Sequence, residues 1–369
     1  MLWFFEQHPL PASTSKTAST YKQPIELKSM NKRKILALTA LAIADGAYAQ
    51  PSFSLYGEVD ASVVHISMPE NSVTGMASGG RSGSNIGVRG EEDLGGGYKL
   101  SFQLESSFKA DGADHEIKPG GRIKLLGSFG EFQTGKLSNM LSDMRDGFNA
   151  TGGSGIIGIN ASNMISGTAI GSINGSSSWS SPNGIAYLSP NVGGFSGRIG
   201  YSFGEQAGNN RLGSNTLMRV GYSSGPVQLA TGYALARGGT DAEGVSYRTF
   251  QLGASYKTGG FQPMLQYVTE RGNSKRIDLY SAGWKFYQGS SEYRMGYTWF
   301  QDKTQNDANS QRIAFGYSYA LSKRTRLFCS IAHMRNEKKA SRKFAGSLSH
   351  SVVAGSNISG HEVGLNHTF

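Results

Sequence analysis

The chain has 369 residues, of which 51 are Gly, 17 Tyr and 18 Phe, against 10 Pro and 1 Cys, and its formal net charge is +10. A single cysteine, Cys329, excludes a scaffold held by disulfides within the chain. No run of about 20 apolar residues occurs, so we expect no transmembrane helix in the mature chain, whereas a membrane barrel would keep hydropathy low through its alternating strands.

The first 49 residues are interpreted as segments outside the fold. Residues 30–49 begin with a basic triplet, continue with an apolar run at 35–44 and end in Ala-Tyr-Ala, which is typical of a secretory signal peptide cleaved before Gln50. A buried amphipathic helix is the alternative interpretation. Residues 1–29 are interpreted as an upstream extension.

Removing these segments takes away 6 basic and 3 acidic residues and leaves 30 basic and 23 acidic ones, a net charge of +7. Such a balance fits nucleic acid, an acidic surface or an anion pathway as the partner. The predicted export argues against nucleic acid.

Alternating apolar and polar residues, separated by turn signals, predict sixteen strands in the mature chain. They are residues 52–66, 82–90, 97–110, 121–127, 129–137, 179–190, 194–204, 215–224, 226–237, 246–257, 261–271, 275–287, 291–303, 311–321, 325–337 and 360–369. Their connections alternate between short and long, which is typical of an outer-membrane barrel. We therefore predict an all-β fold for residues 50–369, a 16-stranded antiparallel transmembrane β-barrel wide enough for an aqueous channel.

The strands have one apolar and one polar face. In residues 97–110, for example, Tyr98 and Leu104 fall on one face, and Lys99 and Glu105 fall on the other. A soluble β-sandwich would bury the apolar face, whereas a wide membrane barrel turns that face to lipid and the polar face to water. Aromatic residues near strand ends favour the barrel, because an interfacial girdle would place them there.

Several motifs resemble those of the trimeric general porins of Gram-negative bacteria, most of all the betaproteobacterial type. They are SLYGEVDASV at 54–63, SNIGVRGEEDLGGGYKLSFQLES at 84–106, GSFGEFQTGK at 127–136, NGIAYLSPNVGGFSG at 183–197 and GHEVGLNHTF at 360–369. They occur in order over essentially the whole mature chain. The RGEEDLGGG element and the C-terminal phenylalanine make the resemblance specific.

The resemblance implies a homotrimer in the cell outer membrane and passive diffusion of ions and small hydrophilic solutes, with no enzymatic activity, cofactor or metal. The implied partners are the lipid bilayer, lipopolysaccharide and the outer-membrane assembly machinery. Phe369 would form part of the assembly signal, or simply end the strand that closes the barrel. The third long loop, residues 138–178 with Asp143, Arg145 and Asp146, would fold inward and narrow the channel, whereas a disordered surface loop is the alternative.

Alternation along the strands predicts which charged residues line the channel. They are Glu58, Asp60, Arg89, Lys99, Glu105, Lys109, Arg198, Arg219, Lys257, Arg294, Arg312 and Arg326, nine basic and three acidic. Because charged rings enrich ions of opposite sign in a confined pore, we expect a mild anion preference. Asp143 and Asp146 on the loop, opposite Arg89 on the wall, would create a transverse field.

Three departures from the family pattern count against full activity. Asn85 and Ala186 stand where family members often carry basic residues, and strand 121–127 is shorter than the about 9 to 11 residues that span a bilayer. A strand that fails to cross would leave backbone groups unpaired in hydrocarbon. The alternative function is therefore a channel-poor or degenerate outer-membrane barrel that serves as an adhesin or surface antigen.

Three patterns that resemble enzyme motifs fail on their context. GSGIIG at 153–158 lacks a preceding strand and a following helix, and GYSSG at 221–225 is followed by Pro226 and a new strand. His361, Glu362 and His367 do not have the spacing of a zinc site. We expect no catalytic residue among them.

Overall fold

In a computed structural model of the chain, the strands with one apolar and one polar face lie side by side in a sheet. The structure describes residues 52–112, 118–137, 140–158, 181–238, 244–272, 275–345 and 348–369. The predicted extension 1–29 and signal peptide 30–49 lie outside the described residues, as does the greater part of the loop 138–178.

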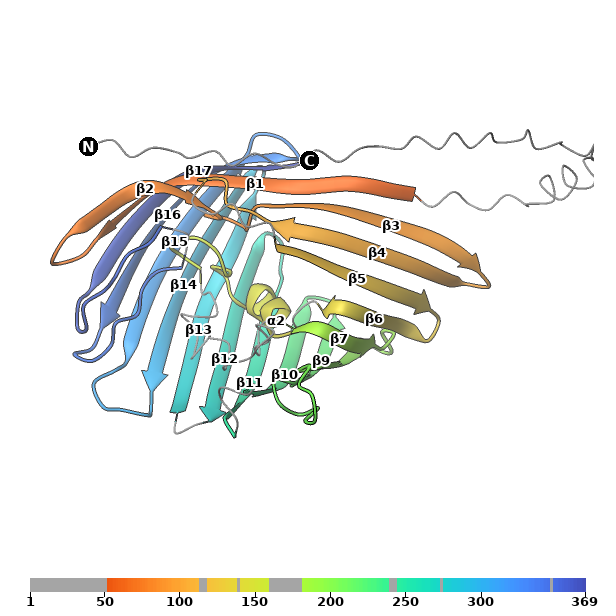
Figure 1. Cartoon of the computed structure of the whole chain (residues 1–369). Coiled ribbons are helices and arrows are strands. Elements are labelled where there is room, and N and C mark those ends of the chain that lie inside the picture. Colours follow the sequence, from red (N-terminus) through yellow and green to blue (C-terminus); the bar gives the residue numbers. More distant parts are fainter. Residues whose placement is uncertain are drawn as a thin grey trace, which may run out of the picture. The chain divides into compact units, whose positions relative to one another are not determined.

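The described residues form seventeen strands and one inward-lying helix (Figure 1). The strands are β1 (Ser52–Ser67), β2 (Ser72–Ser78), β3 (Asn85–Gly95), β4 (Tyr98–Ser107), β5 (Lys118–Gly127), β6 (Gly130–Leu137), β7 (Ser181–Leu188), β8 (Phe195–Ser202), β9 (Asn215–Ser224), β10 (Val227–Arg237), β11 (Ser246–Tyr256), β12 (Phe261–Gly272), β13 (Lys275–Gln288), β14 (Ser291–Asp302), β15 (Ser310–Ala320), β16 (Thr325–Asn336) and β17 (Ile358–Thr368). The helix α2 (Met140–Phe148) lies between β6 and β7.

The sheet closes on itself because β1 pairs with β17. Their register runs antiparallel from Glu58 opposite Thr368 to Ser67 opposite Ser359. On its other side β1 pairs with β3 through residues 52–58 and with β2 through residues 61–67, so β2 and β3 share one position. The result is a closed antiparallel barrel of 16 strand positions, as the sequence predicted.

The second position differs from the sequence prediction. Strand 82–90 was expected there alone, but β2 occupies 72–78 and residues 79–84 leave the sheet before β3 begins at Asn85. Gly75 interrupts the short strand and Gly79, Gly80 and Gly83 follow it, so this stretch of the sequence resembles a loop.

The prediction of a shortened strand at 121–127 is wrong. β5 has 10 residues, Lys118–Gly127, and it pairs with β4 from Ser107 opposite Lys118 to Lys99 opposite Leu126. This length lies within the about 9 to 11 residues of a membrane-spanning strand. Pro119-Gly120-Gly121 resembles a turn in the sequence, yet β4 supplies a pairing partner for these residues.

The apolar face of each strand points away from the barrel interior. Leu104 is 57% exposed and Phe132 53% exposed, whereas Gln133, next to Phe132 and on the other face, is 4% exposed. Large exposed apolar side chains recur on nearly every strand. The reversed arrangement of a membrane barrel is therefore confirmed, with apolar residues outside and polar residues inside.

Aromatic side chains gather near the short turns. Phe129 in the β5–β6 turn contacts Phe132 with ring centroids 5.5 Å apart, and Phe132 contacts Tyr187 at 5.0 Å. On the other side of the barrel Tyr293 contacts Tyr317 at 5.1 Å. Such rings prefer the boundary between hydrocarbon and water, so they mark one edge of the membrane band.

The connections at the turn end are short, such as Gly225-Pro226 and Gly289-Ser290, and several at the other end are long, such as 337–357. Short turns face the periplasm in outer-membrane barrels. Among the described residues, no helix has the length and apolar character needed to cross a bilayer.

We predict that Gly57→Ala destabilises the seam where the barrel closes. A Cβ at Gly57 would collide with the ring of Phe369 and lie 2.8 Å from the backbone oxygen of Asn85. Overpacking of this kind costs about 1–3 kcal/mol, so the midpoint of urea unfolding should fall. Gly197→Ala is the control, because its Cβ would meet its nearest neighbour at 3.8 Å. Equal midpoints for the two variants would contradict the prediction.

Candidate functional site: the narrowed interior of the barrel

Helix α2 lies inside the barrel against its wall (Figure 1). It contacts β9, β10, β11 and β12, and it buries Met144 and Phe148 completely or nearly so. Gln266 Nε2 on β12 donates a hydrogen bond of 3.2 Å to the backbone oxygen of Met144, and the ring of Phe148 packs on Gly253 of β11. The helix is therefore attached to the wall by both apolar and polar contacts.

The segment after the helix follows the wall strand by strand. Asn149 Nδ2 donates to Ser281 Oγ on β13 at 2.9 Å. A Cβ built on Gly283, Gly296 or Gly316 would lie 2.8 Å from Ala150, Thr151 and Ile157, respectively. Because these three wall positions on β13, β14 and β15 carry no side chain, the segment can lie directly on the backbone of the sheet.

Two charged wall residues hold the far end of this segment. Glu362 on β17 accepts a hydrogen bond of 3.2 Å from the backbone N–H of Ile156, and Arg312 on β15 donates to the backbone oxygen of Gly158 and, at 3.1 Å, to Thr151 Oγ1. Arg312 was predicted to line the channel, but its side chain is fully covered by the segment that it holds. Alternation along β15 cannot show this cover, because it does not show what lies on top of a strand.

Apolar side chains fill the interior beside these contacts. The cluster consists of Val64, Ile66, Ala77, Ile156, Ile157, Ala314, Ala332, Met334, Phe344 and Ile358, all buried. It joins β1, β2 and β15–β17 to the segment after α2 and to the β16–β17 connection. This side of the interior is packed with side chains. Consecutive apolar residues in the sequence, such as Val63-Val64 in β1 and Ile156-Ile157 after α2, are the signal for it.

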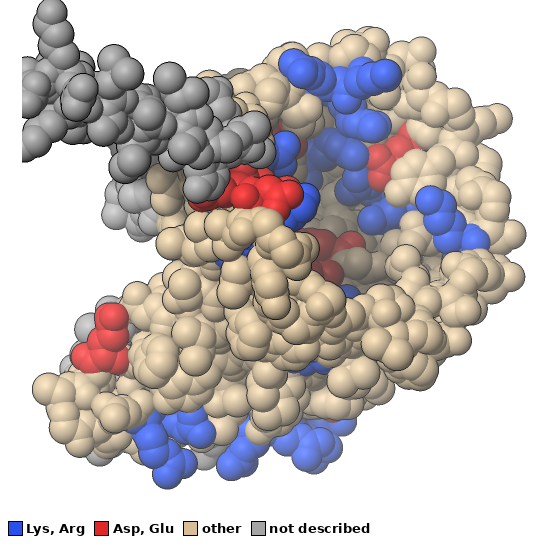
Figure 2. Space-filling model, turned by 90° about the vertical axis from the view of Figure 1, so that its right-hand side faces the viewer, with Lys and Arg blue, Asp and Glu red and all other residues tan. Residues whose placement is uncertain are grey.

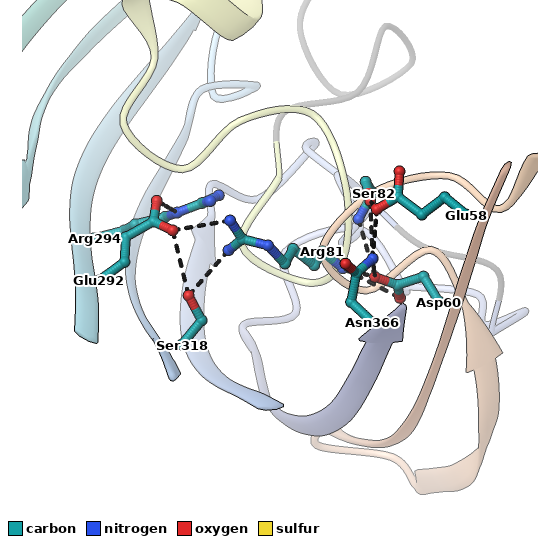
Figure 3. A network of polar contacts seen from close by, with 8 residues as sticks. All are labelled: Glu58, Asp60, Arg81, Ser82, Glu292, Arg294, Ser318 and Asn366. Carbon is teal, nitrogen blue, oxygen red and sulfur yellow. Dashed lines mark hydrogen bonds and ion pairs between the residues drawn. The ribbon is translucent and has the colours of Figure 1, made fainter. Parts of the chain in front are cut away.

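A second inward segment, residues 79–84, is held by Asp60 of β1 (Figure 3). Its carboxylate accepts hydrogen bonds from the backbone N–H groups of Gly80 at 2.7 Å and Ser82 at 3.2 Å, and from Asn366 Nδ2 at 2.9 Å. Asp60 is fully buried, and Glu58 is bonded to Ser82 and Asn366. Both carboxylates were predicted to line the channel, but the structure uses them to fix this segment.

Arg81 projects from this segment across to β14 and β15 (Figure 3). Its guanidinium donates to Glu292 Oε2 at 2.9 Å and to Ser318 Oγ at 3.1 Å, and Glu292 also accepts from Arg294 Nε at 2.7 Å. The family pattern often has an arginine at the position of Asn85, and Arg81 lies four residues before that position. Strand alternation does not point to Arg81, because its role depends on the loop that carries it inward.

The two inward segments touch each other. The backbone N–H of Gly155 donates to the backbone oxygen of Gly79 at 2.9 Å. The pKa of Arg81 is lowered, mainly by burial and then by the positive charge of Arg294, and the negative charge of Glu292 partly opposes this shift. A guanidinium stays protonated at neutral pH, so Arg81 remains a positive charge inside the barrel.

The opposite side carries a second set of ion pairs. Arg198 on β8 binds Asp143 of α2 at 3.1 Å and Gln133 of β6 at 3.2 Å, and Arg145 binds the carboxylate of Asp146 through two bonds of 2.8 and 2.9 Å. Asp143 therefore stands against Arg198, whereas Arg89 had been predicted as the partner of the loop carboxylates.

Arg89 and Glu105 belong to a separate polar group around Tyr56. The guanidinium carbon of Arg89 lies 5.1 Å from the centre of the Tyr56 ring, and the hydroxyl of Tyr56 donates to Glu105 Oε2 at 2.8 Å. Arg122 Nε donates to Gln103 Oε1 of the same group at 2.8 Å.

The other predicted residues occupy different positions on the strands and their connections. Lys99 forms an exposed ion pair of 2.7 Å with Glu91 near the turn end. Lys109 follows the last residue of β4, in the connection to β5, rather than lying on a strand. Arg326 is half-buried on β16, and Phe369 pairs through its backbone with Gly57 at 3.0 and 3.2 Å.

Basic side chains gather around a hollow in the barrel. Figure 2 shows Lys and Arg around this hollow, with a few Asp and Glu beside them. The register places Lys285 of β13 opposite Arg294 of β14, and Arg198 of β8 opposite Arg219 of β9. Basic residues of neighbouring strands therefore lie next to one another on the inner wall.

Two of the enzyme-like patterns lie on the wall and at a turn. GSGIIG at 153–158 is the segment packed on the wall, and GYSSG at 221–225 ends β9 at the turn into β10, with no helix after it.

A family model described as Gram-negative porin matches residues 37–339 of the chain. Outer membrane porin protein 32 of Delftia acidovorans is 28% identical over 365 residues, which cover 92% of this chain and 100% of the relative. Major outer membrane protein P.IB of Neisseria meningitidis is 26% identical over 361 residues, with the same coverage.

Solved structures show the same fold. An anion-selective porin from Comamonas acidovorans superposes with a TM-score of 0.76 at 27% identity, covering 87% of this chain and 100% of that one. Salmonella typhi OmpF, in complex with daunomycin, superposes at 0.65 with 15% identity, covering 86% of this chain and 97% of that one. With its closed barrel, its apolar outer face and its charged, narrowed interior, the chain belongs to the Gram-negative porin family and is an outer-membrane diffusion channel.

Proposed function

We propose that this porin prefers anions and that Arg81 is a main determinant of that preference. The observation that carries the proposal is the position of Glu292, a single carboxylate shared by Arg81 and Arg294. Lys285 of β13 is paired with Arg294 on the neighbouring strand β14. Arg326 lies close enough to Arg81 to act on it electrostatically. One negative charge therefore stands among four positive ones.

The remaining carboxylates of the interior offset little of this excess. The carboxylates of Asp60 and Glu362 are buried and accept hydrogen bonds from backbone N–H groups. Asp143 is paired with Arg198, and Asp146 is paired with Arg145. A confined pore with a low-dielectric wall amplifies the uncompensated charge. The solved relative from Comamonas acidovorans, described as an anion-selective porin, supports the same direction.

We also propose a transverse field across the narrowed region. In this proposal Asp143 and Asp146 of α2 supply the negative side. Arg81 of segment 79–84 and Arg294 of β14, which share Glu292, supply the positive side. A dipolar solute would orient between them, because opposite charges on two walls create a field across the path. The remaining predicted lining residues, Arg89, Lys99, Glu105, Lys109 and Arg326, would tune the field along the path.

The mature protein, in this proposal, begins at Gln50, assembles as a homotrimer and acts only as a passive channel, without catalysis. Phe369 would serve the outer-membrane assembly machinery as a terminal signal. Lipopolysaccharide would contact the outer face.

In a planar bilayer, the protein purified from outer membranes should insert as units whose current rises in three equal steps, one for each channel of the trimer. In a salt gradient the sign of its reversal potential should indicate anion preference. Single steps, or a potential of the opposite sign, would contradict the trimer or the anion preference, respectively.

Replacing Arg81 by Gln should lower the permeability ratio of chloride to potassium by about twofold, because one of four fixed positive charges around Glu292 is lost. The reversal potential in a potassium chloride gradient measures this ratio. Arg335→Gln is the control, since Arg335 is exposed and shares its outward face with Ile331. A shift of the same size in both variants would show that Arg81 has no special role.

Glu362→Ala should loosen the segment 155–158, because the backbone N–H of Ile156 loses its buried acceptor. Leaving such a donor unsatisfied costs about 1–3 kcal/mol. We expect noisier open-channel current and a lower urea midpoint. Glu92→Ala, which removes an exposed carboxylate near the turn end, should change neither quantity. Quiet current in Glu362→Ala would count against this anchoring role.

A further inference from the structure

Four basic residues form a row across four neighbouring strands on the outside of the barrel. Arg248 of β11 is opposite Arg271 of β12, and Arg271 is opposite Arg276 of β13. Lys303, the first residue after β14, continues the row through a backbone hydrogen bond of 2.8 Å to the oxygen of Arg276. All four residues are exposed.

The face of the row is fixed by its strand neighbours. Arg248 alternates onto the same face as Phe250 and Leu252, which are 37% and 45% exposed on the outer surface. Arg276 shares its face with Tyr280. The four basic side chains therefore emerge from the apolar outer surface and not from the channel.

Aromatic rings lie between the row and the apolar band. Tyr267, Tyr280 and Trp299 stand side by side on β12, β13 and β14, with ring centroids 5.1 and 5.5 Å apart. Rings of this kind favour the depth at which acyl chains meet head groups. The basic row lies two same-face positions further along the strands than these rings, since Arg271 is four residues from Tyr267 and Arg276 is four residues from Tyr280.

The height of the row agrees with that depth. Arg276 and Phe286, which contacts Tyr293 near the turn end, are ten residues apart on β13. With a rise of about 3.3 Å per residue and a tilt of about 40°, ten residues span about 25 Å, the height of the apolar band of such barrels. The row therefore lies at the second edge of the membrane, on the side of the long loops, which is the cell exterior.

Like charges in such close register repel one another. Within the described part of the chain, the ion pair of this row joins Lys303 Nζ to Asp278 Oδ2 at 2.5 Å. Three positive charges remain. An anion seated between the arginines would remove the repulsion, and a guanidinium row suits phosphate because each fork can donate two parallel hydrogen bonds.

We propose that this row is a binding site for the phosphate groups of outer-leaflet lipid, that is, of lipopolysaccharide. The rings beneath it would contact the acyl chains and sugars that carry those phosphates. The inference deepens the proposed lipid contact by naming its residues. It rests on the outer-membrane location and is independent of the proposed anion preference.

The test compares lipid binding by wild type and by the triple variant R248Q/R271Q/R276Q. Protein extracted from outer membranes and stripped of lipid in detergent is titrated with purified lipopolysaccharide, and bound lipid is counted by native mass spectrometry. We expect the triple variant to bind at least tenfold more weakly. A triple variant with lysine at the same positions keeps the positive charges but loses the guanidinium groups that donate two parallel hydrogen bonds. We expect it to lose less affinity for lipopolysaccharide than the glutamine variant does.

The double variant K323Q/R324Q is the matched control, because it removes exposed charges from the β15–β16 turn at the opposite edge. It should bind as wild type does. Lipopolysaccharide without its phosphates should bind wild type as weakly as intact lipid binds the glutamine variant, and inorganic phosphate should not displace the intact lipid.

Wild-type affinity in the glutamine variant, or full displacement by inorganic phosphate, would overturn the proposal. So would a change in oligomeric state without any change in lipid binding, because the row would then serve protein contacts. Conductance in bilayers free of lipopolysaccharide tests the channel separately. It should be equal in wild type and the glutamine variant, so a failed anion preference would leave this test intact.

Discussion

The fold depends on one constraint: backbone N–H and C=O groups facing hydrocarbon must be paired within the protein. A sheet meets it only by closing, which the pairing of β1 with β17 achieves. Closure then determines the rest. The apolar face of each strand must turn to lipid, and charged groups gather in the interior or at the two edges of the membrane band, where aromatic rings mark the boundary.

A closed barrel of this width leaves an interior that strand side chains alone cannot fill. Among the residues that the structure describes, two segments held by buried charges enter it. The one after α2 lies on glycine positions of three strands and is held by Glu362 and Arg312, and the one at 79–84 is held by Asp60. Buried carboxylates and a buried guanidinium bind backbone groups of these segments, which would otherwise lack partners. The charges left facing the hollow are mostly basic.

The inward segments also limit what strand alternation can show about single residues. Inward and outward positions followed from alternation, because neighbouring side chains of a strand must point to opposite faces. Alternation could not separate residues that meet water from residues that lie under an inward segment. Asp60 and Arg312 both point inward, yet neither is exposed to the channel. The strand β5 was underestimated because Pro119 and two glycines resemble a turn until the partner β4 is considered.

The sequence by itself determined the sixteen strand positions of the barrel, the reversed polarity and the family resemblance, since these depend on local periodicity and short motifs. Tertiary structure alone decided which charges meet. Arg81 contacts Glu292 over 211 positions of sequence, and Ser62 contacts Glu362 over 300. Such contacts depend on how the sheet closes and on where loops enter it. The outward row of Arg248, Arg271 and Arg276 likewise exists only through register, because no one strand carries it.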